Sequence, residues 1–530
     1  MEMVKRDSDI TKDHVQLILF VLAAVIAALR LQTYSEPLER DMGGYQVFAD
    51  LIRHGGRFFE GVIMDQKPPL VEWTWILGQT VAGYGRGSIY LLNVLVGVAS
   101  LIGYFLAGRL AGGTNRTGIW AAAVWTVISG HLLLEANQPN TEAFINVFDL
   151  FAFVMMARIQ GNEKFLKNIL LIGVCFAAAS LYKHVMVVVP FFVGSAYIAF
   201  PPEGRTRHRA ILDMLIIGAV GVAVWSLMTF YFWGTGRLSN MILALFTFNQ
   251  YYASGSSSGP IANVIHSFVW NRLFPKPLYF AVPLILLGVT GLGIAWKKKQ
   301  FAPWIWLVGL ALGTQVAMAL PGRFFPHYYQ LWFPFLIVSA AWGLTAFERF
   351  TKMPRRIMVG VASLVLVILV CVEAPDYLFK SPEDWSRAKY GEIFIRSDSL
   401  AHLINQVLLP DETFYQLGNE AQLYVLTGRH CPSVTVDVFL GRGPMSGRLT
   451  EKLMEDFQKN PPDLFVLSML TLMPPSNPFM PRNHPVFKWL QENYKPAHGI
   501  EKQAPFVLFT RNGSALEKRL AAEQRPKTND

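Results

Sequence analysis

Long apolar runs restrict the fold of this chain more than any other feature. A helix needs about 20 mainly apolar residues to cross a bilayer, and the sequence contains about eleven such runs. Hydrophobic residues make up 52% of the chain and charged residues only 16%, against roughly 25% charged in soluble proteins. We therefore predict a polytopic α-helical membrane protein. The expected spans lie near 15–33, 89–108, 117–134, 141–158, 168–182, 185–200, 211–233, 278–296, 303–320, 328–347 and 356–373.

The short loops between these runs alternate in charge. Lys and Arg concentrate in cytoplasmic loops of membrane proteins, and every second loop of this sequence is basic. This pattern predicts a cytoplasmic N-terminus, and on the extracytoplasmic face it places residues 34–88, 135–140, 183–184, 234–277, 321–327 and the chain after about 374. The net charge of +10 is then mainly a topology signal, and nucleic acid is not an expected partner. The basic segments contain Lys5, Arg6 and Lys12; Arg109 and Arg116; Arg158, Lys164 and Lys167; Arg205, Arg207 and Arg209; Lys297 to Lys299; and Arg349, Lys352, Arg355 and Arg356.

Two further regions are expected outside the spans. In the first extracytoplasmic loop, "YQVFADLIRH" has one apolar helical face, and "PLVEWTWILGQTVAGYG" is apolar but short, so both predict helices at the membrane surface. After Pro375 the composition changes, and about 150 residues are enough for one soluble domain. There "TFYQLG" and "LFVLSML" predict strands, while "EAQLYVLTG" and "SGRLTEKLMEDFQKN" predict helices. We thus expect a transmembrane domain at 1–373 and a small α/β domain at 374–530.

Unusual polar residues collect on the predicted extracytoplasmic face. Ionisable groups at membrane depth are costly and usually face a polar cavity or a partner. Single members have ordinary explanations, because Lys or Arg at the end of a span can extend to the interface. Acids, bases and aromatics that gather on one face indicate a functional site instead. The residues are Glu36, Asp41, Asp65, Lys67, Glu135, Glu142, Lys183, His184, Arg323 and His327.

The first loop also resembles a known family. "ERDMGGYQVFADLIRHGG" and "DQKPPL" resemble the first extracytoplasmic loop of C-type (GT-C) membrane glycosyltransferases. The similarity is to a bacterial branch that resembles protein O-mannosyltransferases and the lipid A aminoarabinose transferase. "RFFPHYYQLWFPFL" and "TFYQLGNEAQLYVLTGR" are similar to later segments of that branch. One departure is Asp41-Met42, where many relatives carry Asp-Glu, so no role of a second acid is carried over.

The resemblance implies an inverting hexosyl- or pentosyltransferase. Such an enzyme moves a sugar from a polyprenyl-phosphate-linked donor to a cell-envelope acceptor, which is a lipid, a glycan or a protein. The expected location is a bacterial inner membrane, with the reaction and the C-terminal domain on the periplasmic face. Asp41 matches the family's first-loop acid, so the resemblance makes it the expected general base. Glu142 is the second candidate for a catalytic carboxylate.

The chemistry of that donor suits the cations on this face. A polyprenyl phosphate lies at headgroup level, so its binding needs positive charge at the membrane boundary. Lys67 in "QKPP" best fits stabilisation of the charge that develops on the leaving phosphate, although a stiff turn is the ordinary explanation of this motif. Tyr45, Asp65 and Tyr328 are candidates to line the substrate site. The predicted donor-phosphate ligands are Lys67, Lys183, His184, Arg323 and His327.

Other cofactors and functions are less well supported by the sequence. No Cys/His spacing resembles a zinc site, so we predict no metal, although a divalent cation between Asp41 and Glu142 is possible. A transporter, a lipid flippase or a non-catalytic partner in envelope polysaccharide assembly would have a similar composition. Transporters often contain internal repeats and charges near the bilayer midplane. This sequence has no evident repeat, and its polar residues gather at one face, which favours the transferase.

Overall fold

The computed structural model describes residues 10–59, 66–112, 114–159, 165–254, 259–351, 353–436, 443–469, 480, 483–498 and 503–523. Contacts divide the chain into two compact units. The first, called the helical unit below, contains Met1–Tyr34, Leu92–Tyr231 and Tyr252–Ser381. The second, called the mixed unit, contains Ser35–Leu91, Phe232–Tyr251 and Pro382–Asp530. The predicted division of the chain at residue 373 stays a prediction.

Each predicted span coincides with a helix in the structure. Eight helices of the described residues are long and apolar enough to cross a membrane, if the short 3-10 segments before α14 and α16 are counted with them. The predicted class of polytopic α-helical membrane protein is confirmed. The eight are α1 (Lys12–Ser35), α4 (Arg86–Gly112), α7 (Phe165–Tyr182), α9 (Arg207–Gly234), α14 (Val282–Lys297), α15 (Ala302–Ala319), α16 (Phe333–Phe350) and α17 (Arg355–Phe379).

The other three predicted spans are helices that are shorter or more charged. α5 (Asn115–Ile128) has 14 residues and α8 (Val188–Ala199) has 12. α6 (Thr141–Arg158) has 18 residues but includes Glu142, Asp149 and Arg158. The predicted number of spans therefore stays a prediction, while a helix at each predicted position is a finding.

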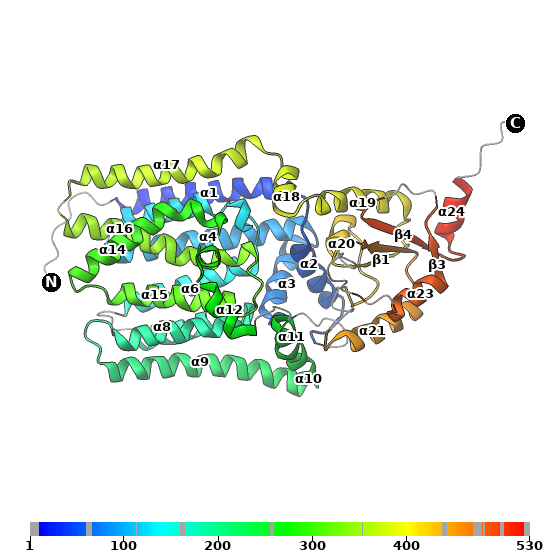
Figure 1. The fold of residues 1–530 in the computed structure, drawn as a ribbon, viewed down its shortest axis with the longest axis horizontal. Coiled ribbons are helices and arrows are strands. Elements are labelled where there is room, and N and C mark those ends of the chain that lie inside the picture. Colours follow the sequence, from blue (N-terminus) through cyan, green and yellow to red (C-terminus); the bar gives the residue numbers. More distant parts are fainter. Residues whose placement is uncertain are drawn as a thin grey trace. The chain divides into compact units, whose positions relative to one another are not determined.

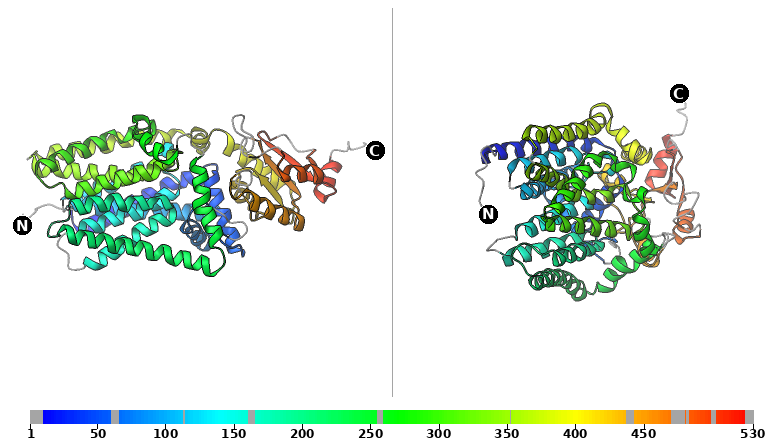
Figure 2. Two further views of the ribbon diagram at one scale, coloured as in Figure 1. Left: turned by 60° about the horizontal axis from the view of Figure 1, so that its bottom comes forward. Right: turned by 60° about the vertical axis from the view of Figure 1, so that its left-hand side comes forward.

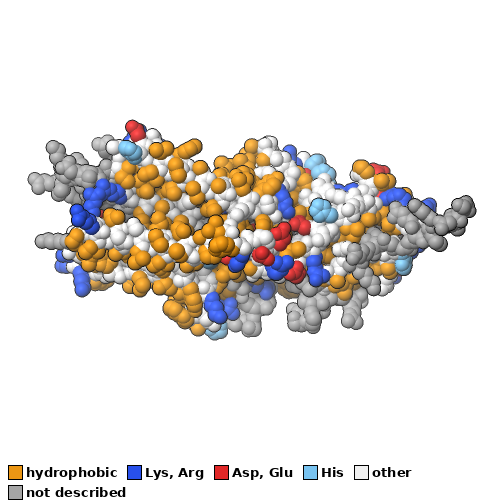
Figure 3. Space-filling view, turned by 90° about the horizontal axis from the view of Figure 1, so that it is seen from above, with side chains coloured by type: hydrophobic (Ala, Val, Ile, Leu, Met, Phe, Trp, Pro, Cys, Tyr) orange, Lys and Arg blue, Asp and Glu red, His pale blue; other side chains and the backbone are white. Residues whose placement is uncertain are grey.

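The helices of the helical unit lie side by side (Figures 1 and 2). α16 lies at its centre, because 83% of its most apolar window is buried, whereas only 17% is buried in α1 and in α9. Hydrophobic side chains predominate on one face of this unit, and Lys and Arg gather at one end of it (Figure 3). An apolar exterior with Lys and Arg at one end is typical of a bundle that spans a bilayer.

Close packing between α14 and α16 depends on glycine. A Cβ atom on Gly291 would lie 2.4 Å from the Cα atom of Gly343. A Cβ atom on Gly343 would lie 2.1 Å from the carbonyl oxygen of Leu287. Small residues let membrane helices approach each other closely, where dispersion forces rather than water drive association.

The mixed unit combines helices with a four-stranded sheet of order β1-β2-β4-β3. β1 (Phe414–Leu417) and β2 (Leu464–Ser468) are parallel and fully buried, while β4 (Phe506–Arg511) is antiparallel to both β2 and β3 (Tyr494–Pro496). The two predicted strands are β1 and β2, and the predicted α/β character of the C-terminal segment is confirmed. Its helices are α18 (Pro382–Tyr390), α19 (Ile393–Val407), α20 (Gln422–Thr427), α21 (Ser446–Lys459), α23 (Pro485–Asn493) and α24 (Ala515–Glu523).

The first loop contributes both predicted helices to the mixed unit. They are α2 (Arg40–Arg53) and α3 (Leu70–Ala82). α2 packs against α3 and α20. A Cβ atom on Gly43 would lie 2.5 Å from the Cα atom of Gln422, so glycine lets α2 lie directly on the start of α20. The start of the first loop is therefore packed against the C-terminal part of the chain.

Candidate functional site

The first turn of α2 presents Asp41. Glu39 caps this helix, because its carboxylate accepts hydrogen bonds from the backbone N–H groups of Asp41 (2.8 Å) and Met42 (2.7 Å). Asp41 is half-buried. Its carboxylate forms no hydrogen bond or ion pair with another residue that the structure describes. A carboxylate without such contacts keeps lone pairs that can accept a proton, so Asp41 is available as a base.

Tyr45 contacts Lys67 and lies on the same helix as Asp41. Tyr45 lies one turn after Asp41 on the same face of α2, since residues four apart are neighbours on a helix. Its buried ring is 5.5 Å from the ring of Trp75, and the Nζ atom of Lys67 is 4.7 Å from its centroid. An ammonium over an aromatic face is held by the ring's electrostatic field. Tyr45 and Lys67 are therefore in contact, and Asp41 lies one helical turn before Tyr45 in the same unit.

The backbone at Lys67 is held by a segment that sequence reasoning missed. Asn249 donates hydrogen bonds to the carbonyl oxygens of Gln66 (2.9 Å), Ala244 (3.3 Å) and Leu245 (3.0 Å). It is the second residue of α11 (Phe248–Ser254), which follows a π-helical turn at Leu243–Thr247. π-helical turns occur frequently at functional sites. The sequence signal is weak, because asparagine in "FNQYY" has no distinguishing neighbour.

The other end of the first loop is held by α10 (Leu238–Ile242) and the residue before it. Arg237 donates a hydrogen bond to the carbonyl oxygen of Phe58 (2.7 Å), and Asn240 donates one to that of Phe59 (2.9 Å). The segment 237–249 thus forms hydrogen bonds to the backbone at Phe58, Phe59 and Gln66. Asp65 lies outside the described residues, so its predicted role stays a prediction.

In the helical unit, Glu142 is paired with Lys183. Glu142 lies in the first turn of α6 and is fully buried. The ammonium of Lys183 forms a salt bridge with its Oε1 atom, and the hydroxyl of Thr141 donates a hydrogen bond to Oε2 (3.0 Å). The Nζ atom of Lys183 is also 3.9 Å from the ring centroid of Tyr328. The carboxylate of Glu142, the second candidate for a catalytic acid, is therefore already paired with the ammonium of Lys183.

A second pair lies beside Tyr328. The Nδ1 atom of His327 is 3.1 Å from the Oε2 atom of Glu135. The rings of His327 and Tyr328 meet edge to face at 4.8 Å. Tyr328 contacts both Lys183 and His327. One cluster therefore contains Glu135, Glu142, Lys183, His327 and Tyr328. The basic side chains of Lys183 and His327 thus each lie beside an acid, Glu142 and Glu135 respectively.

The remaining predicted cations are placed differently. Arg323 donates a hydrogen bond to the carbonyl oxygen of Tyr252 (3.0 Å), and its guanidinium lies 4.1 Å from that residue's ring centroid. His184 begins the 3-10 segment His184–Val187 that follows Lys183, and it is half-buried. Asp41 and Lys67 belong to the mixed unit, whereas Glu142, Lys183, His184, Arg323, His327 and Tyr328 belong to the helical unit.

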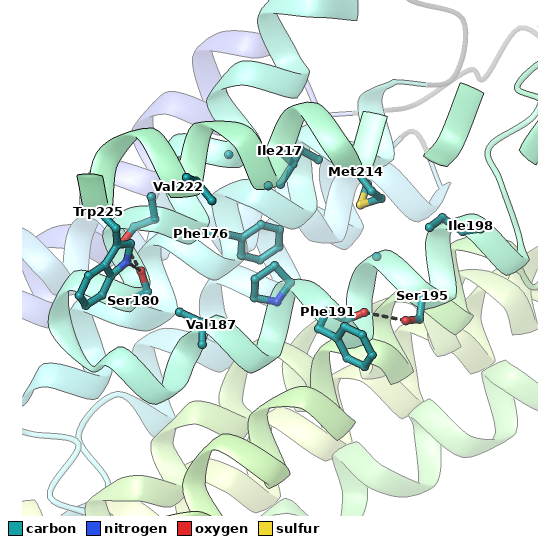
Figure 4. Close-up of a pocket in the computed structure, with 16 residues that line it drawn as sticks. Phe176, Ser180, Val187, Phe191, Ser195, Ile198, Met214, Ile217, Val222 and Trp225 are labelled. Carbon is teal, nitrogen blue, oxygen red and sulfur yellow. Dashed lines mark hydrogen bonds between the residues drawn. The ribbon is translucent and has the colours of Figure 1, made fainter. Parts of the chain in front are cut away.

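A cavity of about 500 Å³ lies between α7, α8 and α9 of the helical unit. Its walls are almost entirely apolar, with Phe176, Ile217 and Val222 facing the space (Figure 4). Two hydrogen bonds are drawn beside them: the indole of Trp225 donates to the hydroxyl of Ser180 (2.8 Å), and the hydroxyl of Ser195 donates to the carbonyl oxygen of Phe191 (2.8 Å). This lining suits a hydrocarbon chain and offers no group for acid–base chemistry, and it includes none of the predicted site residues.

Comparison with known proteins supports a relationship over part of the sequence. Residues 66–233 match the family model described as dolichyl-phosphate-mannose-protein mannosyltransferase. The matched segment contains Lys67, Glu142, Lys183 and His184. A search of curated proteins finds no significant match.

Solved structures show the same fold over most of the chain. ArnT from Cupriavidus metallidurans, bound to undecaprenyl phosphate, has a TM-score of 0.58 at 15% identity, covering 96% of this chain and 99% of ArnT. The oligosaccharyltransferase AglB from Archaeoglobus fulgidus, in complex with an inhibitory peptide and a dolichol-phosphate, has a TM-score of 0.52 at 12% identity, covering 87% of this chain and 70% of AglB. Together with the family match, these folds confirm that the chain resembles the GT-C superfamily of membrane glycosyltransferases, in the branch similar to protein O-mannosyltransferases and the aminoarabinose transferase.

Proposed function

We propose that this protein is an integral-membrane glycosyltransferase that moves a sugar from a polyprenyl-phosphate-linked donor to a cell-envelope acceptor. The family match and the shared fold support the reaction class. The structures of both relatives contain a polyprenyl phosphate, which supports the donor class. The observation that carries the proposal is the arrangement of Asp41, Tyr45 and Lys67 within the mixed unit.

Asp41 is proposed as the general base. An acceptor hydroxyl becomes a competent nucleophile only as a carboxylate removes its proton. The oxygen then bonds to the anomeric carbon while the bond from that carbon to the phosphate oxygen breaks, which inverts the configuration. The proton passes to Asp41, and polyprenyl phosphate leaves. Asp41 suits this role because its carboxylate has no competing hydrogen bond or ion pair among the described residues.

Lys67 is proposed to stabilise the leaving phosphate. Negative charge grows on the phosphate oxygens as the glycosidic bond breaks, and a fixed cation lowers the energy of that transition state. Tyr45 and the hydrogen bond from Asn249 to Gln66 restrict the ammonium and the backbone before it. Pro68 and Pro69 restrict the backbone after it. A preorganised charge of this kind needs little rearrangement during the reaction.

The cations of the helical unit are proposed as further phosphate ligands with unequal prospects. Arg323 is the better candidate, because its printed contacts are with the carbonyl oxygen and the ring of Tyr252 and not with an acid. Lys183 and His327 already contact Glu142 and Glu135, so a phosphate would have to compete with a carboxylate. We also propose that the reaction occurs on the extracytoplasmic face of a bacterial inner membrane, with the N-terminus in the cytoplasm, as the charged loops predict.

Transfer of a radiolabelled sugar tests the base. Purified protein is incubated with a panel of polyprenyl-phosphate sugars and membrane extract, and Asp41→Asn is compared with the intact chain. We expect a loss of about a hundredfold or more, because general-base catalysis typically contributes 10²–10⁴-fold. Asp411→Asn is the matched control, since Asp411 is an exposed acid of the same unit. If Asp41→Asn transferred sugar as well as the intact chain, Asp41 would not be the base and Glu142 would become the candidate. If the intact chain transferred sugar from none of the donors, the proposed reaction would be refuted.

Inhibition by the lipid product tests Lys67. Undecaprenyl phosphate without a sugar should compete with the donor, because it carries the phosphate that Lys67 is proposed to bind. Lys67→Met should lower kcat by about a hundredfold, as removal of one transition-state donor does elsewhere, and should weaken inhibition by undecaprenyl phosphate. Lys488→Met removes a lysine that is 81% exposed and should change neither value. Unchanged inhibition of the Lys67 variant would contradict the phosphate contact.

A further inference from the structure

Asp50, His54 and His430 converge in the mixed unit, outside the site described above. One ligand atom from each residue lies within 4.8 Å of the other two. The Nδ1 atom of His430 is 2.6 Å from Oδ2 of Asp50, and the Nδ1 atom of His54 is 3.3 Å from Oδ1 of Asp50. The two imidazole rings are 4.8 Å apart. Two histidines therefore approach one carboxylate from opposite oxygens.

The fold builds this cluster from two distant segments. Asp50 and His54 are four residues apart at the end of α2, so they lie on one face of the helix. His430 follows α20, whose first residue Gln422 is packed directly against Gly43. Close packing at that point fixes α2 and the segment after α20 relative to each other. The cluster is thus held by the backbone of the unit and not only by its own side chains.

An ordinary ion pair explains part of this geometry but not all of it. A single hydrogen bond from His430 accounts for Oδ2 of Asp50. Oδ1 belongs to a side chain that is only 4% exposed and accepts no hydrogen bond from the described residues, because His54, 3.3 Å away, directs its Nδ1 to the backbone carbonyl oxygen of Asp50 (2.9 Å). A buried carboxylate oxygen without a partner is costly. A cation between the rings would satisfy this oxygen and both imidazoles at once.

The donor set indicates which cation. Two imidazoles and one carboxylate are typical ligands of Zn²⁺ and related transition metals, whereas Mg²⁺ and Ca²⁺ prefer oxygen alone. With zinc–ligand bonds of about 2.1 Å, the ligand atoms of a tetrahedral site lie about 3.4 Å apart. The two nitrogen–oxygen separations, 2.6 and 3.3 Å, are shorter than that value, and all three ligand atoms lie within 4.8 Å of one another, so side-chain rotations would open the cluster to fit an ion. His54 and His430 are 62% and 60% exposed, which leaves an open side for entry of the ion and for a water ligand.

We propose that Asp50, His54 and His430 bind one Zn²⁺ ion, with a water molecule as the fourth ligand. The ion joins the end of α2 to the segment after α20, which are separated by some 380 residues of sequence. Binding energy at such a bridge stabilises the folded unit, since the unfolded chain does not hold the three ligands together. The proposal does not depend on the transferase activity, because none of the three residues takes part in the proposed reaction.

Metal titration tests the site directly. Untagged full-length protein in detergent is stripped with EDTA, exchanged into chelator-free buffer and titrated with ZnCl₂ by calorimetry. CoCl₂ serves as a second probe, because its visible absorption reports nitrogen and oxygen ligation. The variants are Asp50→Asn, His54→Gln and His430→Gln, and His498→Gln is the control because His498 is an exposed histidine of the same unit. Thermal unfolding with and without Zn²⁺ provides a readout besides binding.

The intact chain and the control should bind one Zn²⁺ per chain and unfold at a higher temperature when it is present. Each ligand variant should bind at least about tenfold more weakly, since even loss of an outer partner of a metal ligand costs 10–100-fold. If Asp50→Asn fails to fold, the two exposed histidines still decide the question. Absence of Zn²⁺ binding by the intact chain, or equal binding by His430→Gln and His498→Gln, would overturn the proposal.

Discussion

Glu142 and Asp41 are both acids at the start of a helix, yet their surroundings differ. Glu142 is fully buried in the helical unit, where Lys183 and Thr141 occupy both carboxylate oxygens. Asp41 is half-buried in the mixed unit, and its carboxylate has no such contact with the described residues. In both cases a helix N-terminus favours a negative charge. Of the two carboxylates, only that of Asp41 remains available to contact a substrate.

The difference indicates how one chain uses acids for two purposes. A buried carboxylate must be compensated, and the compensating cation then becomes part of the structure. A proton acceptor must instead keep an unoccupied lone pair where substrate can reach it. Glu142 and Lys183 therefore fit a structural or positioning role, whereas Asp41 fits catalysis. The sequence analysis weighed both acids as catalytic, and the contacts favour Asp41.

The largest effect should follow removal of Lys183. Lys183→Ala leaves the buried Glu142 carboxylate without its cation, and loss of one member of a buried pair costs about 3–5 kcal/mol. Unfolding in mixed SDS micelles should show this loss of stability. Asp41→Asn removes an acid with no comparable contact and should change stability by less than about 0.5 kcal/mol.

A double variant separates charge from packing. Lys183→Met combined with Glu142→Gln removes both charges while it keeps most of the volume. It should be more stable than Lys183→Ala alone, because no unpaired charge remains. If Lys183→Ala were as stable as the intact chain, Glu142 would not depend on its partner, and the contrast with Asp41 would fail.

A smaller effect should follow a change beneath Asp41. Gly43→Ala places a methyl group 2.5 Å from Gln422, so α2 must shift from α20, and overpacking of this kind costs about 1–3 kcal/mol. Sugar transfer should fall with stability, because α2 carries Asp41. Gly44→Ala is the matched control, since a Cβ atom there has no neighbour within 4 Å. Equal transfer by the two variants would show that Asp41 does not depend on this contact.

The apolar and periodic patterns of the sequence predicted the elements well. Runs of about 20 apolar residues located the long helices, and α2 and α3 followed from one-sided apolar spacing. β1 and β2 were predicted from short apolar runs. These features depend on local solvation and backbone geometry, so a single sequence contains them.

Contacts between distant residues were not predictable in the same way. Lys183 is 41 residues from Glu142, and His430 is 380 residues from Asp50. Such pairs depend on how the helices and the sheet pack, which a local pattern does not encode. The role of Asn249 was equally unpredictable, because it depends on which carbonyl oxygens its side chain contacts in the fold. The sequence therefore indicated the face on which polar residues gather. It did not indicate that Glu142, and not Asp41, is paired with a cation.

The smallest effect concerns a charge pair outside the spans, between Glu412 and Arg519 in the mixed unit. Arg519 donates hydrogen bonds to both oxygens of Glu412 (2.8 and 2.6 Å), which holds the pKa of that carboxyl below its usual value. A lowered pKa means that the pair stabilises the fold above the ordinary Glu pKa of about 4.3 and ceases to do so as pH falls through the folded-state value. Arg519→Gln should cost up to about 1 kcal/mol at pH 7, and the difference from the intact chain should shrink below about pH 4.

Thermal unfolding at neutral and acidic pH measures that difference, with Lys518→Gln, an exposed neighbour on α24, as the control. Arg519 is 33% exposed, whereas Glu142 is 1% exposed, and solvent competes with an exposed pair far more than with a buried one. The loss for Arg519→Gln should therefore be several times smaller than for Lys183→Ala. A comparable loss in both would mean that burial is not what makes Glu142 depend on Lys183, and the assignment of Glu142 to structure and Asp41 to catalysis would lose its physical basis.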